Sequence, residues 1–120
     1  MKSIRFIITI IIAVVSGVFT YAQSHDHSQM ASIKTESIKV WGNCDLCKAR
    51  IEKAAKIDGV SKADWNMDNR ILTLVYNPAL TTSDKVQERI AAVGHDTEKF
   101  KADNKVYNTL PGCCQYERNN

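Results

Sequence analysis

The sequence predicts an α+β domain with the element order β-α-β-β-α-β. This order is the ferredoxin-like sandwich, in which two helices cover one face of a four-stranded antiparallel sheet. Apolar and polar residues alternate in four short segments, and apolar residues recur at helical spacing in two others. Turn-forming residues separate these segments, and together they cover residues 33–101. A chain of 120 residues has room for one such domain.

The first half of the domain is predicted to be strand, helix and strand. Residues 33–40 and 60–67 are the strands, because apolar and polar side chains alternate along both. Between them, apolar residues recur on one helical face, namely Cys47, Ile51, Ala54 and Ala55. Asp58-Gly59 supplies the glycine at which helices commonly end.

The second half is predicted to repeat strand, helix and strand. Residues 71–76 alternate and stop at Asn77-Pro78. Ser83 or Asp84 is expected to cap the second helix, whose apolar residues are Val86, Ile90 and Val93. Residues 95–101 are expected to form a weaker fourth strand. Beyond them, residues 102–120 are predicted to be a polar tail that contains two adjacent cysteines.

The first 22 residues are predicted to be a secretory signal peptide. Lys2 and Arg5 precede an apolar run of 14 residues, and Thr20-Tyr21-Ala22 has small residues at the positions that signal peptidases require. A membrane anchor is the alternative, but the run is shorter than the ~20 residues that span a bilayer. We expect cleavage after Ala22, a periplasmic protein without stable membrane insertion, and a flexible polar lead-in at 23–32.

The charge balance argues against nucleic acid as a partner. The net charge is +3, and removal of the first 22 residues leaves 14 basic and 13 acidic side chains. A DNA-binding or RNA-binding domain is expected to carry a clear excess of basic residues.

The motif Cys44-Asp45-Leu46-Cys47 lies where the first predicted strand meets the first helix. Two thiols at this spacing can converge on one point. The helix N-terminus favours thiolates, and Lys48 and Arg50 add positive charge nearby. Two thiolates suit a soft ion that accepts few ligands, such as Cu(I) or Hg(II), whereas a structural zinc site needs four ligands.

The residues around this motif resemble the heavy-metal-associated domain family, over about residues 33–101. The matching residues are Gly42-Asn43-Cys44-Asp45-Leu46-Cys47, Ile51, Ala54, Ala55, Ile57, Gly59, Val60, Tyr76-Asn77-Pro78 and Gly94-His95-Asp96. The family includes copper chaperones, modules of copper-pumping ATPases and the periplasmic mercury-binding protein. The resemblance implies that Cys44 and Cys47 bind the metal on an exposed loop and pass it to a partner by ligand exchange. The methionine that the family has just after the position of Gly42 is absent, and Trp41 is a candidate to pack beneath the loop instead.

Other residues are candidate metal ligands outside the motif. His95 lies near the metal loop in the family, and the alternative for it is an ordinary surface histidine. Cys113 and Cys114 are candidates for extra thiolate ligands, for a disulfide to the first pair, or for idle thiols. Cleavage after Ala22 would place His25 third in the chain, where amine, amides and imidazole can hold Cu(II) or Ni(II). A solvated linker is the simpler interpretation of that segment.

A basic stripe on the first helix, formed by Lys48, Arg50 and Lys53, is a candidate docking surface for an acidic partner. A solvated helix face is the commoner explanation of such a stripe.

Three functions are therefore in competition. We favour the binding and delivery of Cu(I), with Hg(II) as alternative cargo, by a non-enzymatic protein that is a monomer or a metal-bridged dimer. Its partner would be a metal transporter or another metal-receiving protein. A thiol–disulfide oxidoreductase could use the same C-x-x-C, but neither Pro78 nor Pro111 offers an obvious companion to the loop. A structural zinc site would use all four cysteines, and the adjacent pair lacks the usual spacing.

Overall fold

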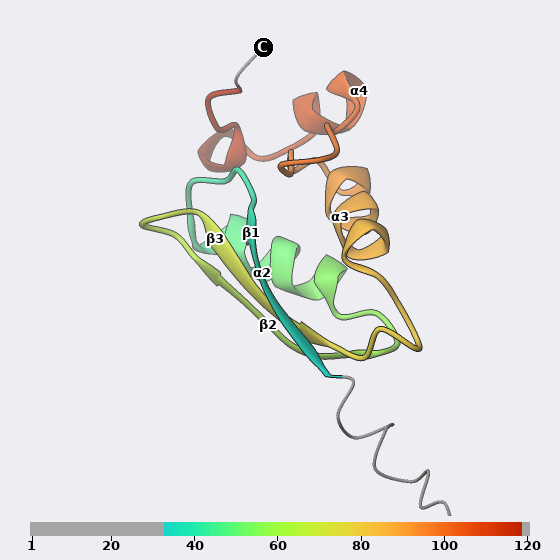
Figure 1. The fold of residues 1–120 in the computed structure, drawn as a ribbon. Helices are drawn as coiled ribbons and strands as arrows, with labels where there is room; N and C mark the ends of the chain where they lie inside the picture. Colours follow the sequence, from blue (N-terminus) through green and yellow to red (C-terminus); the bar gives the residue numbers. More distant parts are fainter. Residues whose placement is uncertain (1–32, 119–120) are drawn as a thin grey trace, which may run out of the picture.

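The structure of the protein, a computed structural model, describes residues 33–118 (Figure 1). The predicted signal peptide, the lead-in and His25 lie outside the described residues. The described elements are β1 (Lys34–Lys39), α2 (Asp45–Ala55), β2 (Val60–Asn66), β3 (Ile71–Tyr76), α3 (Ser83–Ala92), α4 (Asn104–Asn108) and a 3-10 helix, η2 (Gly112–Cys114). Within residues 33–118, none of the helices has the length and apolar character needed to cross a membrane.

The sheet is antiparallel, and its strand order is β1-β3-β2. Leu72 at the centre of β3 pairs with Ile38 of β1 on one side and with Trp65 of β2 on the other. These three side chains lie on one face and are almost completely buried. The helices α2 and α3 cover that face (Figure 1) and bury Ile51, Val86 and Ile90 against it. The predicted α+β fold, with helices on an antiparallel sheet, is confirmed for these elements.

The N-cap of helix α3 lies one residue before the first of the two predicted caps. Thr82, rather than Ser83 or Asp84, occupies the N-cap, and its hydroxyl accepts a hydrogen bond from the backbone N–H of Lys85 at 3.2 Å. Thr82 takes this role because its extended backbone places the hydroxyl over the free N–H groups of the first turn.

The fourth strand predicted at residues 95–101 is not formed in the described part of the chain, residues 33–118. Val40 and Thr97 instead make a single antiparallel bridge at the edge of β1. The Thr97 hydroxyl accepts a hydrogen bond from the Phe100 N–H at 3.0 Å, and the Thr97 N–H donates to the Phe100 carbonyl at 2.7 Å. This turn takes the chain away from β1, so that strand pairing stops after one bridge.

The segment that follows folds back over the sandwich. Residues 102–118 carry α4 and η2 to the end of the molecule where β1 finishes and α2 begins (Figure 1). Leu110, Cys114 and Tyr116 are buried members of the hydrophobic core. The C-terminal segment therefore contributes to the core as well as to the surface beside the C-x-x-C loop.

Candidate metal centre

Four thiols meet at the start of α2. The Sγ atom of Cys44 lies 3.4 Å from that of Cys47 and 3.3 Å from those of Cys113 and Cys114. The sulfur atoms of Cys44, Cys47 and Cys114 all lie within 4.8 Å of one another, close enough for one metal ion to bind all three. All four cysteines are free thiols in the structure.

The backbone at the start of α2 leaves the Cys44 thiol available. Cys44 is the N-cap residue, in an extended conformation, and no side chain caps the helix. Most helices place a hydroxyl or carboxylate at this position. A thiol here lies instead beside the positive end of the helix dipole, which favours the thiolate form.

Cys47 and Trp65 both lie close to Gly42 in the hydrophobic core. Cys47 and Trp65 are both fully buried, and the Trp65 indole donates a hydrogen bond to the carbonyl of Val40 at 3.0 Å. A Cβ atom at Gly42 would lie 3.1 Å from the Cys47 Cβ and 3.1 Å from the Trp65 ring. The absence of a side chain at Gly42 thus lets the loop pack directly on Trp65. Trp41, the expected packing group, is partly buried against the same core.

The thiols differ in acidity. Burial works to raise the pKa of Cys44, but interactions with the Cys47 backbone N–H and with the neighbouring thiols outweigh it and lower the pKa to about 7. Burial raises the pKa of Cys47 to about 12. The hydrogen bond with Cys44, followed by burial, raises the pKa of Cys113 to about 11. Of these three thiols, Cys44 loses its proton first, near neutral pH.

His95 is fully buried rather than exposed on a loop. Its Nδ1 lies 2.9 Å from the Trp41 carbonyl, which can only accept, so Nδ1 carries the proton. The ring stacks on Tyr116 with centroids 5.5 Å apart, and Nε2 has no hydrogen-bond partner among the described residues. Burial lowers the pKa of His95. The three-sulfur group does not include His95, and the ring supports the C-terminal segment.

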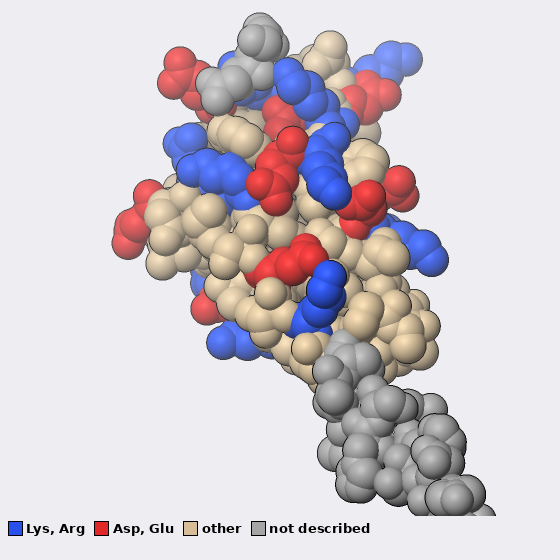
Figure 2. Space-filling model, in the orientation of Figure 1, with Lys and Arg blue, Asp and Glu red and all other residues tan. Residues whose placement is uncertain are grey.

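The three basic residues of the predicted docking stripe differ in their surroundings. Lys48 joins α2 to β2, since its ammonium group donates to Glu52 at 2.7 Å, to Asp64 at 2.9 Å and to the Trp65 carbonyl at 2.7 Å. Arg50 and Lys53 line a groove of about 710 Å³ between α2 and α3. On the face seen in Figure 2, acidic and basic side chains are interspersed rather than gathered by sign.

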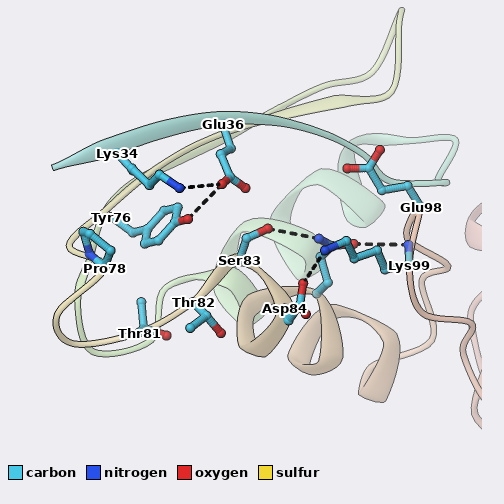
Figure 3. A pocket seen from close by; sticks show the side chains of 11 residues that line it. Lys34, Glu36, Tyr76, Pro78, Thr81, Thr82, Ser83, Asp84, Glu98 and Lys99 are labelled. Carbon is cyan, nitrogen blue, oxygen red and sulfur yellow. Dashed lines mark hydrogen bonds and ion pairs between the residues drawn. The ribbon is translucent and has the colours of Figure 1, made fainter. Parts of the chain in front are cut away.

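A second hollow, of about 360 Å³, lies between β1 and the start of α3 (Figure 3). Four of its five charged side chains pair with one another. Glu36 contacts Lys34 at 3.8 Å and accepts a hydrogen bond from the Tyr76 hydroxyl at 2.9 Å, and Lys99 contacts Asp84 at 2.9 Å. The hollow contains neither cysteine nor histidine, so the thiol cluster is the candidate metal centre.

Sequence reasoning missed the residues that hold the C-terminal segment against the thiols. Tyr116 and Arg118 make the main contacts: the Tyr116 hydroxyl accepts a hydrogen bond from the Asp96 N–H, and Arg118 donates to the Asp96 carboxylate. The one signal in the sequence is that aromatic residues, Tyr107 and Tyr116, flank the cysteine pair in an otherwise polar segment.

The fold and the thiol loop define a heavy-metal-associated domain, and the chain belongs to that family. The model of the heavy-metal-associated domain matches residues 43–96. The match ends before the C-terminal segment that carries Cys113 and Cys114.

Among the relatives is the copper chaperone CopZ of Staphylococcus epidermidis, which is 36% identical over 63 residues, covering 51% of this chain and 93% of CopZ. A zinc-transporting ATPase of Synechocystis is 34% identical over 77 residues, which are 62% of this chain but only 11% of the ATPase. The chain thus matches a small part of the transporters among its relatives.

Several solved structures share the fold. The CopZ metallochaperone superposes with a TM-score of 0.52 at 30% identity, covering 53% of this chain and 98% of that one. Oxidized MerP from Ralstonia metallidurans CH34 superposes with a TM-score of 0.52 at 28% identity, covering 55% of this chain and 94% of that one.

Proposed function

We propose that this protein binds Cu(I) through the thiolates of Cys44 and Cys47 and delivers it to a metal-receiving protein. The observation that carries the proposal is the convergence of sulfur atoms at the start of α2, with 3.4 Å between Cys44 and Cys47. Thiolates are soft ligands that favour Cu(I). The similarity to proteins named copper chaperones supports the same cargo.

Delivery follows from the position of Cys44, which is partly exposed while Cys47 is buried. An incoming thiolate from the partner forms a bond to the ion, and a bond from the ion to one of the resident sulfurs then breaks. Copper remains Cu(I) throughout, and the proton lost by the incoming thiol is balanced by one taken up by the released sulfur. No chemical turnover is needed. A metal transporter fits this role, because several relatives are metal-transporting ATPases.

We place this delivery in the periplasm, after cleavage following Ala22, on the strength of the N-terminal sequence pattern. N-terminal sequencing of the protein from a periplasmic fraction tests this, with Gln23 as the expected first residue. An intact Met1, or recovery from the cytoplasm alone, would contradict the location.

Light scattering with and without Cu(I) distinguishes a monomer from a metal-bridged dimer.

Hg(II) is the second candidate cargo. The structural similarity to oxidized MerP, which superposes over 94% of its length, favours it. Hg(II) is also a soft ion that binds few thiolates. The two cargoes make different predictions about affinity, and one titration compares them.

The test is a competition titration of the reduced protein with Cu(I), Hg(II) and Zn(II) against a chelator of known affinity. We expect the protein to compete with the chelator more effectively for Cu(I) than for Hg(II) or Zn(II). The Cys44→Ser and Cys47→Ser variants should lose Cu(I) binding. The matched control is Ser61→Cys, which adds a thiol on β2 and leaves the loop intact. Tight Zn(II) binding with weak Cu(I) binding would contradict the proposal, as would reduction of insulin disulfides by a protein that binds no soft metal.

A further inference from the structure

We propose that residues 110–118, termed the cysteine arm, turn the two-cysteine loop into a three-thiolate site. Cys114 is the third ligand of the bound ion, and Cys113 is the exchange thiol through which the ion enters and leaves. This inference rests on the proposed function, because it concerns the same ion.

The first anchor of the cysteine arm is Leu110, which packs against the end of α3. Leu110 is buried, and its Cδ2 atom would lie 2.9 Å from a Cβ at Gly94. Gly94 has a φ of +110°, so glycine serves both the backbone conformation and the close contact. Leu110 therefore fixes the arm on the side that precedes the two cysteines.

The second anchor is Tyr116, on the other side of the two cysteines. Tyr116 is 1% exposed, and its hydroxyl donates to the Gly94 carbonyl and accepts from the Asp96 N–H, both at 2.8 Å. Its ring stacks on His95 and meets the ring of Tyr107 edge to face, with centroids 5.0 Å apart. A hydrogen-bonded, buried tyrosine of this kind holds the backbone of its neighbours in one place.

The third anchor is an ion pair between Arg118 and Asp96. Two guanidinium nitrogens of Arg118 donate to the two carboxylate oxygens of Asp96, each at 2.9 Å. A third contact runs to the carbonyl of Ala102 at 2.6 Å. Fork-shaped pairs of this kind add orientation as well as attraction. The cysteine arm is thus held at Leu110, Tyr116 and Arg118, and both thiols project from the segment between these anchors.

The two adjacent cysteines have different surroundings. Cys114 is fully buried and joins Cys44 and Cys47 in the three-sulfur group, whereas Cys113 is exposed and lies outside that group. Both lie 3.3 Å from Cys44 at their sulfur atoms. An ion held by the inner three sulfurs therefore has one further thiol within reach, on the side open to solvent.

The exchange step follows from this arrangement. Cys113 loses its proton and forms a bond to the Cu(I) ion, and the bond from the ion to Cys114 breaks. The Cys114 sulfur takes up a proton, so that no net charge or electron is lost and the copper stays Cu(I). The ion is then held by Cys44, Cys47 and Cys113, and a partner's thiolate can reach it from the exposed side, where Cys113 lies.

The same arrangement discriminates among metals. Zinc in structural sites takes four ligands in a tetrahedron. The inner group offers three sulfurs, and a fourth sulfur ligand would have to be Cys113, the exchange thiol. Cu(I) and Hg(II), which accept low coordination numbers, fit three thiolates better.

X-ray absorption spectroscopy of the Cu(I)-loaded protein tests the inference by counting sulfur neighbours of the metal. We expect three sulfurs in the unmodified protein and two in Cys114→Ser, with a Cu(I) affinity lower by about tenfold or more. Cys113→Ser should keep three sulfurs and slow transfer to an acceptor chelator by about tenfold. The control is Gly112→Ala, because Gly112 is on the arm and the added carbon would have nothing within 4 Å. It should leave the sulfur count, the Cu(I) affinity and the transfer rate unchanged.

Tyr116→Phe tests the arm without removing a thiol. It keeps all four cysteines and the stacking on His95, but it loses both hydrogen bonds of the hydroxyl. We expect it to lower the sulfur count from three towards two while the circular dichroism spectrum is unchanged. Two sulfurs in the unmodified protein, with no effect of Cys114→Ser on affinity, would overturn the role of the arm and leave the Cys44–Cys47 site standing. Retention of Cu(I) binding after loss of Cys44 and Cys47 would overturn the proposed function itself.

Discussion

At the scale of single residues, Cys44 is the thiol at which we propose that metal binding begins. Its sulfur contacts those of the other three cysteines, and its pKa of about 7 lies below that of an ordinary thiol because polar contacts outweigh burial. The other ligands release their protons when the metal binds, which makes metal binding dependent on pH.

The acidity of Cys44 leads to a prediction about alkylation. In the reduced, metal-free protein, modification of Cys44 by a pulse of iodoacetamide should rise with a midpoint near pH 7, while Cys113 stays largely unmodified until the pH approaches its pKa of about 11. Peptide mass spectrometry after each pulse measures both. Cys113→Ser should raise the Cys44 midpoint, because the Cys113 thiol lowers the pKa of Cys44. A midpoint at about 8.5, the value of a free thiol, would count against this account.

The ion pair between Asp96 and Arg118 leads to a second prediction. Burial works to raise the pKa of the Asp96 carboxyl, but hydrogen bonds from Arg118 and from the Ala102 N–H hold it below its usual value. An acid whose pKa is lower in the folded state than in the unfolded state stabilises the fold at pH values above the unfolded-state pKa. This stabilisation is lost as the pH falls through the folded-state pKa.

Arg118→Gln should therefore lower the free energy of unfolding by about 2–3 kcal/mol at pH 7, since it leaves a buried carboxylate without its partner. The difference from the unmodified protein should shrink as the pH is lowered and Asp96 becomes protonated. Denaturant unfolding at several pH values measures this. Lys105→Gln removes an equal charge from an exposed position and should change stability by no more than about 0.5 kcal/mol. Equal losses in both variants would show that net charge, rather than the ion pair, is responsible.

At the scale of elements, local patterns were sufficient for three strands and two long helices. Alternation along β3 and the helical spacing of Cys47, Ile51 and Ala55 depend only on which face is buried, so the sequence predicts them directly. The predicted fourth strand does not form, because a turn at Thr97 ends the pairing beside β1 after one bridge. That turn depends on a hydrogen bond between a side chain and the backbone, which an alternation pattern does not reveal.

The contact between α3 and the cysteine arm leads to a third prediction. Gly94→Ala places a side chain at a φ of +110° and within 2.9 Å of Leu110. The combined cost should be about 2–4 kcal/mol, from the unfavourable backbone conformation and the overpacking. Thermal unfolding measures it. Gly112→Ala, which meets nothing within 4 Å, is the matched control and should change stability by no more than about 0.5 kcal/mol. A Gly94→Ala protein as stable as the control would mean that Leu110 does not hold the arm.

At the scale of the whole molecule, the sequence located the C-x-x-C loop at the start of a helix but not the way the chain folds over it. Cys44 and Cys47 lie three residues apart, so the start of a helix is enough to bring them together. Cys44 and Cys114 lie 70 residues apart, and their contact depends on the anchors at Tyr116 and Arg118. The burial of His95 beneath Tyr116 has the same cause, since a histidine that follows a helix is expected at the surface until a distant segment covers it.

The central claim is that the thiols at the start of α2 hold one soft metal ion per chain. Native mass spectrometry of the reduced protein, mixed with a slight excess of Cu(I) and then with a competing chelator, tests it most directly. We expect one copper ion to remain on the unmodified protein and on Gly112→Ala, and none on the double variant Cys44→Ser, Cys47→Ser. Retention of copper by the double variant, or loss of copper from all three proteins, would contradict the claim.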